Sequence, residues 1–308
     1  MRIQNKLLVL VDGSERSIRT VNYVKEIMPV DGSIRIVLFH VFSGLPEEFR
    51  DLEDQLKSWE TERENKARSD LEQAKDVLIN GGFAEEAIEI KFHRLEKGVA
   101  RDIIDEARNG YSAVVMSRRG MGSLQSIILG SVAVKLLEKL TFIPIIFVGQ
   151  APPVKKFLLA VDASPSSMKA VEFVASLVGG RSYAVCIFHA ILRLGSVSFE
   201  LPGDNMPELP DVKMTDTCIE AFKLKVARLF QDVKGVLMAS GFESEKISEK
   251  IVSGVYSRSE TIVKEAEDGG YGTIVVGRRG LSKVEAFFMG RVGHKVVYGG
   301  KKFTVWVV

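Results

Sequence analysis

The sequence repeats one pattern, once in each half. Residues 6–14 (KLLVLVDGS) return as residues 156–164 (KFLLAVDAS), 150 positions later. A second motif, Ser-Arg-Arg-Gly at 117–120, returns as Gly-Arg-Arg-Gly at 277–280, 160 positions later. These offsets are far longer than the period of about 20 to 50 residues found in solenoid repeats. They indicate a duplicated domain, with the proline pair at 152–153 marking the join.

The predicted domains are residues 1–150 and 151–308. Each is close to the common domain size of about 100 to 150 residues and can bury its own core. Hydrophobic residues make up 46% of the chain and charged residues 27%, which is typical of globular proteins. The net charge of +2 provides no strong field for nucleic acid or a membrane surface, so we expect neither as a partner.

Cysteine content and apolar runs bear on the compartment. The chain has two cysteines, which is no disulfide framework and suits a reducing environment. The apolar run at 7–11 is shorter than the core of a signal peptide and leads into a turn. No run approaches the roughly 20 apolar residues of a membrane helix. We therefore expect a cytoplasmic protein.

Strand-like and helix-like patterns alternate along each half. The apolar run at 7–11 is typical of a strand buried on both faces, and 34–42 predicts a second strand. The alternation predicts an α/β fold with two doubly wound domains, each a five-stranded, mostly parallel sheet flanked by helices. The last strands, 143–148 and 303–308, are apolar and could pair with each other across a pseudo-twofold axis.

The second half is longer between its histidine strand and its glycine motif. From His189 to Gly280 there are 91 positions, against 80 from His40 to Gly120. The extra residues fall at 195–211, where several prolines oppose regular structure. We expect a surface loop there, and a lid over a ligand is the alternative.

Small residues gather after the first and fourth predicted strands of the first half. Ligands of open parallel sheets bind outside the carboxyl ends of the strands. Asp12 follows the first strand, and Gly120 and Gly122 offer backbone N–H groups without obstructing side chains. Gly130 and Ser131 begin a helix, whose N-terminus attracts anions. This arrangement predicts a cradle for a polyphosphate.

These motifs resemble the nucleotide signature of universal stress proteins. That signature is glycine, two residues, glycine, nine residues, then glycine followed by serine or threonine. The first half matches it through Ser131, except that Ser117 replaces the first glycine. Val-Asp-Gly-Ser at 11–14 and His-Val at 40–41 also match the family. The resemblance covers nearly the whole chain and implies a tandem universal stress protein with two domains of the adenine nucleotide alpha-hydrolase-like fold.

The resemblance also implies an ATP or AMP site in the first half, with any Mg²⁺ carried on the phosphates. A cyclic nucleotide is not distinguished from these. Asp12 would reach the adenine or ribose, Val41 would contact the base, and Met116 would lie near the sugar. The other predicted site residues of this half are Gly13, Ser117, Gly120, Gly122, Gly130, Ser131 and Val132.

The second half departs from the signature. Its predicted site residues are Asp162, Gly277, Gly280, Gly290 and Arg291. Arg291 replaces the phosphate-binding serine, and it could bind an anion or fill the pocket itself. Ala163 replaces the glycine after the aspartate. We therefore expect the better nucleotide site in the first half.

Enzyme motifs are not found in this sequence. A Walker loop is missing, and Gln125 stands where a dinucleotide fingerprint requires its third glycine. The four histidines are too scattered to predict a catalytic triad or a metal site. We expect a non-catalytic stress-response regulator, with at most slow hydrolysis of bound ATP.

The same residues also allow a structural interpretation. The glycines could serve only to turn the chain, and the protein would then be a scaffold whose two halves form an intramolecular pseudo-dimer. The arginine pairs at 118–119 and 278–279 fit solvated loop ends as well as phosphate contacts. His40 and His189 fit backbone hydrogen bonds better than metal binding, and the two aspartates could cap their own turns. Whether chains pair further into a homodimer is left open.

Overall fold

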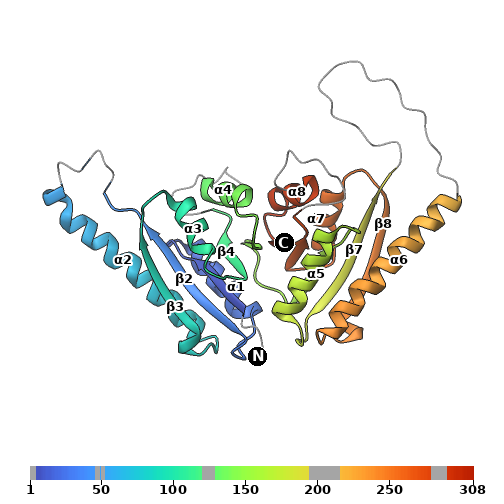
Figure 1. Cartoon of the computed structure of the whole chain (residues 1–308), viewed down its shortest axis with the longest axis horizontal. Helices are drawn as coiled ribbons and strands as arrows, with labels where there is room; N and C mark the ends of the chain where they lie inside the picture. The colour runs from blue at the N-terminus through green and yellow to red at the C-terminus, as the bar shows by residue number, and fades with distance from the viewer. Residues whose placement is uncertain (1–4, 46–48, 50–52, 120–128, 194–215, 279–289) are drawn as a thin grey trace, which may run out of the picture.

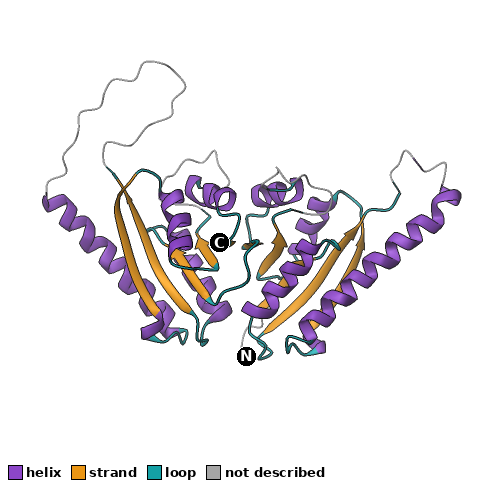
Figure 2. Ribbon diagram, turned by 180° about the vertical axis from the view of Figure 1, so that it is seen from behind, coloured by secondary structure: helices purple, strands orange, loops and turns teal. Residues whose placement is uncertain are grey.

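The computed structural model describes residues 5–45, 49, 53–119, 129–193, 216–278 and 290–308. Figures 1 and 2 show two similar halves side by side, each with a sheet between layers of helices. The predicted loop or lid at 195–211 lies outside the described residues. No helix in the described part of the chain is long and apolar enough to span a membrane.

Each half alternates strands and helices as the sequence predicts. The elements of the first half are β1 (Asn5–Leu10), α1 (Glu15–Ile27), β2 (Ile34–Phe42), α2 (Glu53–Ile79), the 3-10 helix η2 (Glu85–Ala87), β3 (Ile88–Arg94), α3 (Val99–Ala107), β4 (Ala113–Ser117), α4 (Ser131–Lys139) and β5 (Ile145–Val148). Those of the second half are β6 (Lys156–Ala160), α5 (Pro165–Val178), β7 (Ala184–Leu192), α6 (Asp216–Ala239), the 3-10 helix η3 (Ser244–Lys246), β8 (Ile247–Val255), α7 (Arg258–Asp268), β9 (Thr273–Val276), α8 (Arg291–Gly299) and β10 (Thr304–Val307).

The strands form one continuous sheet in the order β3-β2-β1-β4-β5-β10-β9-β6-β7-β8. All neighbours within a half are parallel, which confirms the predicted doubly wound α/β fold. The halves join where β5 and β10 pair antiparallel, with Trp306 opposite Ile146. The predicted pairing of the two final strands is therefore confirmed.

Two cores lie on opposite faces of the sheet. Leu7 and Val9 of β1 point into one core together with Val24 of α1, whereas Leu8 points into the other with Leu136 of α4. Successive strand residues face opposite sides, so a strand covered on both faces must be apolar throughout. Each core contains residues of both halves.

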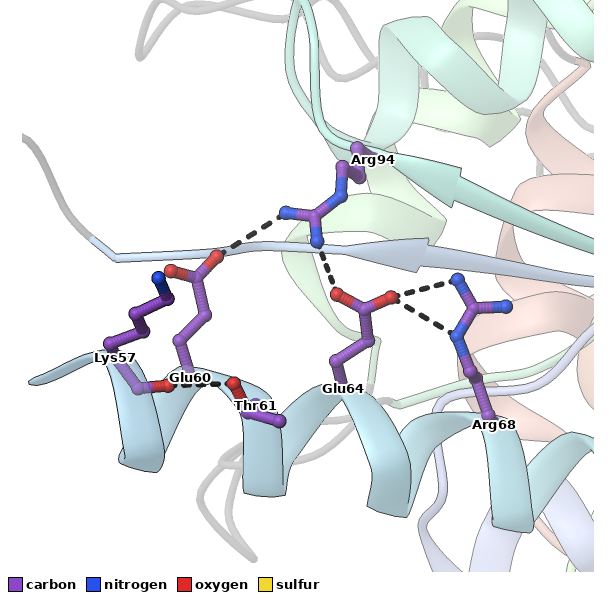
Figure 3. Close-up of polar contacts among 6 residues, drawn as sticks. All are labelled: Lys57, Glu60, Thr61, Glu64, Arg68 and Arg94. Atoms are coloured by element: carbon purple, nitrogen blue, oxygen red, sulfur yellow. Dashed lines mark hydrogen bonds and ion pairs between the residues drawn. The ribbon is translucent and has the colours of Figure 1, made fainter.

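Helix α2 is long and highly charged, and ion pairs attach it to the neighbouring strand β3. Figure 3 shows Arg94 at the end of β3 reaching both Glu60 and Glu64 of α2. Glu64 also binds Arg68 one turn later, with 2.7 Å between Arg68 Nη2 and Glu64 Oε1. The Arg68 guanidinium stacks 4.0 Å above the ring of Phe92. These charged contacts add to the apolar side of α2, where Leu71, Ala74 and Leu78 are buried in the core.

A buried chain of hydrogen bonds crosses the join. Trp306 Nε1 of β10 donates to Tyr23 Oη of α1 over 2.9 Å. The same Tyr23 oxygen lies 2.8 Å from Thr273 Oγ1 of β9. All three side chains are almost completely inaccessible to solvent, and burial raises the pKa of Tyr23. The first half therefore supplies the hydrogen-bond partner of the largest buried side chain of the second half.

We predict that Tyr23→Phe destabilises the protein by about 1–3 kcal/mol, because it leaves the Trp306 N–H and the Thr273 hydroxyl buried without their partner. Urea denaturation followed by tryptophan fluorescence measures the free energy of unfolding. A decrease of less than about 0.5 kcal/mol in the free energy of unfolding would contradict this role of Tyr23. Tyr271→Phe serves as the control, because it removes the hydroxyl of a tyrosine that lies away from the join.

Candidate functional site

The first half contains a cavity of about 190 Å³ at the carboxyl ends of its strands. Leu10 to Asp12 line it after β1, and Phe39 to Val41 line it from β2. Residues Met116 to Arg118 border it at the end of β4. The helices α3 and α4 contribute the remaining side, including the first residues of α4. The cavity thus lies where parallel sheets of this type bind ligands.

The structure brings most of the predicted residues of the first half to this cavity. Those that line it are Asp12, Val41, Met116, Ser117, Gly130, Ser131 and Val132. Gly13 does not line it but follows Asp12 directly. Gly120 and Gly122 lie outside the described residues. Phe39, Val99 and Ile103 also line the cavity, and the sequence analysis missed them because apolar pocket walls look like ordinary core positions.

Asp12 shapes the turn at the mouth of the cavity. Its Oδ1 accepts hydrogen bonds from the Ser14 backbone N–H at 3.1 Å and from the Ser14 hydroxyl at 2.6 Å. Ser14 in turn caps helix α1. Gly13 has a φ of +76°, and a Cβ there would lie 2.2 Å from Asp70 Oδ2 of α2. The turn thus needs glycine for its torsions, whereas the Asp70 carboxylate is the end of a side chain that could turn away.

The N-terminus of α4 opens toward the cavity. Gly130 is its N-cap, and no side chain of the described residues caps it. The Gly130 N–H donates to the Arg118 carbonyl at 2.8 Å, while the N–H groups of Ser131 and Val132 belong to the first turn, which lacks intrahelical acceptors. These groups and the positive end of the helix dipole favour an anion.

The second half has a corresponding but smaller cavity of about 110 Å³. Its predicted residues Asp162, Gly277, Gly290 and Arg291 all line it. Gly280 lies outside the described residues. Arg291 is the first residue of α8, so a cation stands where the first half has Ser131. The two cavities therefore differ in both size and charge.

Ser117 and Gly277 show why the two motifs differ. No described non-glycine residue has a positive φ, so Ser117 fits with ordinary torsions, and its hydroxyl donates to the Arg119 carbonyl at 2.6 Å. A Cβ on Gly277, by contrast, would lie 2.8 Å from backbone atoms of Ser166 and Ser167. The glycine of the second half thus permits helix α5 to approach, and that helix, through Ser167, narrows the cavity.

His40 and His189 make the backbone hydrogen bonds that the sequence favoured over metal binding. His40 Nδ1 donates to the Val11 carbonyl and His189 Nδ1 to the Val161 carbonyl, each at 2.7 Å. Each bond ties a second strand of a half to the end of its first. Burial lowers the pKa of His189. Among the described residues, no three His, Cys, Asp or Glu side chains converge as a metal site would require.

The interpretation of Arg118 and Arg278 as solvated or phosphate-binding was wrong. Both are buried, and their side chains cross the join between the halves. Arg118 Nη2 donates to the carbonyls of Gly300 at 2.9 Å and Phe303 at 2.8 Å, and its Nη1 donates to Val297. Arg278 donates reciprocally to the carbonyls of Leu137 and Leu140 in the first half. In the sequence, the one indication of this structural role is that both copies of the motif have an arginine at this position.

Comparison with known proteins gives the same assignment as the fold and the glycine loops. The sequence model of the Universal stress protein family matches residues 4–148 and again 153–308. The chain belongs to this family and contains two universal stress protein domains in tandem. The resemblance stated from the motifs is thereby confirmed.

Individual relatives are distant. A universal stress protein of Mycolicibacterium smegmatis is 27% identical over 139 residues, which are 44% of this chain and 47% of that protein. The chain thus spans about half the length of this curated relative. The crystal structure of a universal stress protein from Archaeoglobus fulgidus has a TM-score of 0.61 at 19% identity, covering 99% of this chain and 98% of the other. A functionally unknown protein from Pseudomonas aeruginosa PAO1 has a TM-score of 0.53 at 14% identity, covering 99% and 92%. These structures support the fold.

We predict that Gly277→Ser, which copies the motif of the first half, destabilises the protein by about 1–3 kcal/mol, because its Cβ meets the backbone of α5. The reverse change, Ser117→Gly, introduces no clash and removes only the hydrogen bond from the Ser117 hydroxyl to the Arg119 carbonyl, so it should alter stability by at most about 1 kcal/mol. Denaturant unfolding of both variants measures the difference. Equal effects would show that the close approach at Gly277 is unimportant.

We also predict that the stability of the protein falls as the pH is lowered below about 6.5, the ordinary pKa of histidine. Burial disfavours protonation of His189 in the folded state, so the unfolded chain binds more protons in this range. His189→Gln removes this contribution. Thermal unfolding between pH 5 and 7.5 should therefore show a weaker pH dependence for the variant, and identical dependence would refute the assignment.

Proposed function

We propose that the cavity of the first half binds an adenine nucleotide, ATP or AMP, and that the protein acts as a non-catalytic stress-response regulator. One observation carries the proposal. The first turn of α4, which no described side chain caps, lines the same cavity as Asp12 and Val41. The helix end favours an anion, and the apolar side chains of Val41, Val99 and Ile103, which line the same cavity, favour a flat apolar group.

In this arrangement the phosphates lie at the N–H groups of Ser131 and Val132, with the Ser131 hydroxyl as a further donor. Met116 lies beside the sugar, and the Asp12 carboxylate, held by Ser14, is oriented toward the ribose or the base. Any Mg²⁺ enters on the phosphates. Nucleotide occupancy would be read by partner proteins as a change in the surface around the cavity.

The cavity of the second half supports this function less well. It is smaller, and Arg291 at the start of α8 opposes the helix dipole unless an anion neutralises it. We therefore assign adenine nucleotide binding mainly to the first half. A scaffold without nucleotide binding is the alternative, and the experiment below separates the two.

The test is direct. Purified protein is denatured and the released nucleotides are identified by mass spectrometry, and ATP and AMP are titrated into nucleotide-free protein by calorimetry. We expect one main site, a rise in thermal stability with ligand, and no appreciable phosphate release. The absence of both co-purified nucleotide and binding would favour the scaffold.

Matched substitutions locate the site. We predict that Gly130→Glu places a carboxylate at the helix end and weakens ATP binding at least about tenfold, roughly 1.4 kcal/mol or more. Gly290→Glu makes the same change in the second half and should leave the main site intact. If the two variants bind equally well, or if only Gly290→Glu loses binding, the assignment to the first half is wrong.

A further inference from the structure

Each half inserts one buried arginine into the other half, at the C-terminal end of a short helix. Arg278 Nη1 donates to the Leu137 carbonyl at 2.8 Å, and its Nη2 donates to the Leu140 carbonyl at 2.7 Å. These are the last carbonyls of α4. Arg118 makes the equivalent bonds at the end of α8, to Val297 and Gly300. We call these two sets of contacts the arginine clamps.

Electrostatics explains why an arginine suits each position. The last carbonyls of a helix lack intrahelical partners and carry partial negative charge. A planar guanidinium can donate to two of them at once. The exposed fractions of Arg118 and Arg278 are only 6% and 7%, so water competes little for these bonds. Burial lowers the pKa of Arg118 to about 10, which leaves it charged at neutral pH.

The clamped helices are the ones that form the cavities. Helix α4 has nine residues, so its N-terminus at the first cavity and its clamped C-terminus are roughly 13 Å apart. Helix α8 has the same length and begins at the second cavity. Figure 1 shows both helices near the middle of the molecule. A shift of either C-terminus therefore moves the first-turn N–H groups at the other end.

The backbone of each arginine is also hydrogen-bonded to the glycine that begins the helix at the cavity of its own half. The Arg118 carbonyl accepts from the Gly130 N–H at 2.8 Å, and the Arg278 carbonyl accepts from the Gly290 N–H at 2.7 Å. Hydrogen bonds thus connect the two helices end to end. The C-terminal carbonyls of α4 bind the Arg278 guanidinium, and the Arg278 backbone carbonyl binds the N-cap of α8. Arg118 connects the C-terminus of α8 to the N-cap of α4 in the same way.

We propose that Arg118 and Arg278 are positioning residues that couple the two cavities. Arg278, which belongs to the second half, fixes the helix end that binds the anion in the first half. Anion binding at one helix therefore alters the order of the other. This inference rests on the proposed function, because the ligand used to detect it is the nucleotide.

We predict that Arg278→Met weakens ATP binding at the first cavity about fivefold or more, within the usual range of coupling between sites. Arg278 is not among the described residues that line either cavity, so the loss arises through α4. Calorimetry measures the affinity. Hydrogen exchange in the ligand-free protein should show faster exchange in α4 than in wild type, with a smaller change in α3.

Two further variants separate positioning from general destabilisation. Tyr23→Phe weakens the same join without touching α4, so it should lower stability yet keep the wild-type affinity. Arg278→Lys keeps the charge and one donor direction, so its affinity should lie between those of wild type and Arg278→Met. If Arg278→Met fails to fold, the affinity and exchange of Arg278→Lys serve as the test.

The outcomes are distinct. Wild-type affinity in Arg278→Met, or an equal loss in Tyr23→Phe, overturns the proposal. If wild-type protein binds no ATP, the proposed function fails, and hydrogen exchange alone decides the role of Arg278. Faster exchange confined to α4 then supports positioning, and unchanged or uniformly faster exchange refutes it.

Discussion

The antiparallel pairing of β5 with β10 is the contact on which the rest of the structure depends. Both strands are buried along their whole length and apolar except for Thr304, which would be unfavourable for a strand at an open sheet edge. Pairing them gives both strands a second neighbour and turns two five-stranded sheets into one. Tyr23 and Thr273 then complete the hydrogen bonding of Trp306 inside this join. The two halves are therefore joined both by strand pairing and by buried side-chain hydrogen bonds.

The cavities depend on this join through their helices. A nine-residue helix is too short to be stable alone, so α4 and α8 rely on packing and on contacts at their ends. The join supplies one end contact of each helix through an arginine from the opposite half. The other end of each helix has no side-chain cap among the described residues and lines a cavity. The same two helices thus depend on the join and form part of the cavity walls.

The sequence predicted the fold well because its signals are local or repeated. Apolar runs such as 7–11 identify buried strands, and two copies of the same order of elements define the sheet. The gathering of Asp12 and Gly130 at one cavity followed from their positions after a strand and at a helix start, and from the rule that parallel strands end at the same edge. Met116, by contrast, was expected at this cavity only from the family resemblance.

Other features were beyond the sequence because they depend on where distant segments meet. The partners of Arg118 and Arg278 are backbone carbonyls, which have no sequence signature and lie more than 130 residues away. The packing of Gly277 against α5, and of Gly13 against Asp70, likewise depends on how closely a helix approaches a turn. The apolar walls at Phe39 and Ile103 cannot be told from core by residue type. Each missed feature is a tertiary contact.

Both domains that meet at the join belong to one chain, and this affects how amino-acid substitutions can accumulate in the two cavities. In a dimer of identical subunits, every substitution is present twice, so a damaged pocket is damaged in both copies. Here Ser131 and Arg291 occupy equivalent helix starts yet differ in charge, while the join between the halves is preserved. The lining of one cavity can therefore change by substitution while that of the other stays as it is, because the two are encoded separately in one chain.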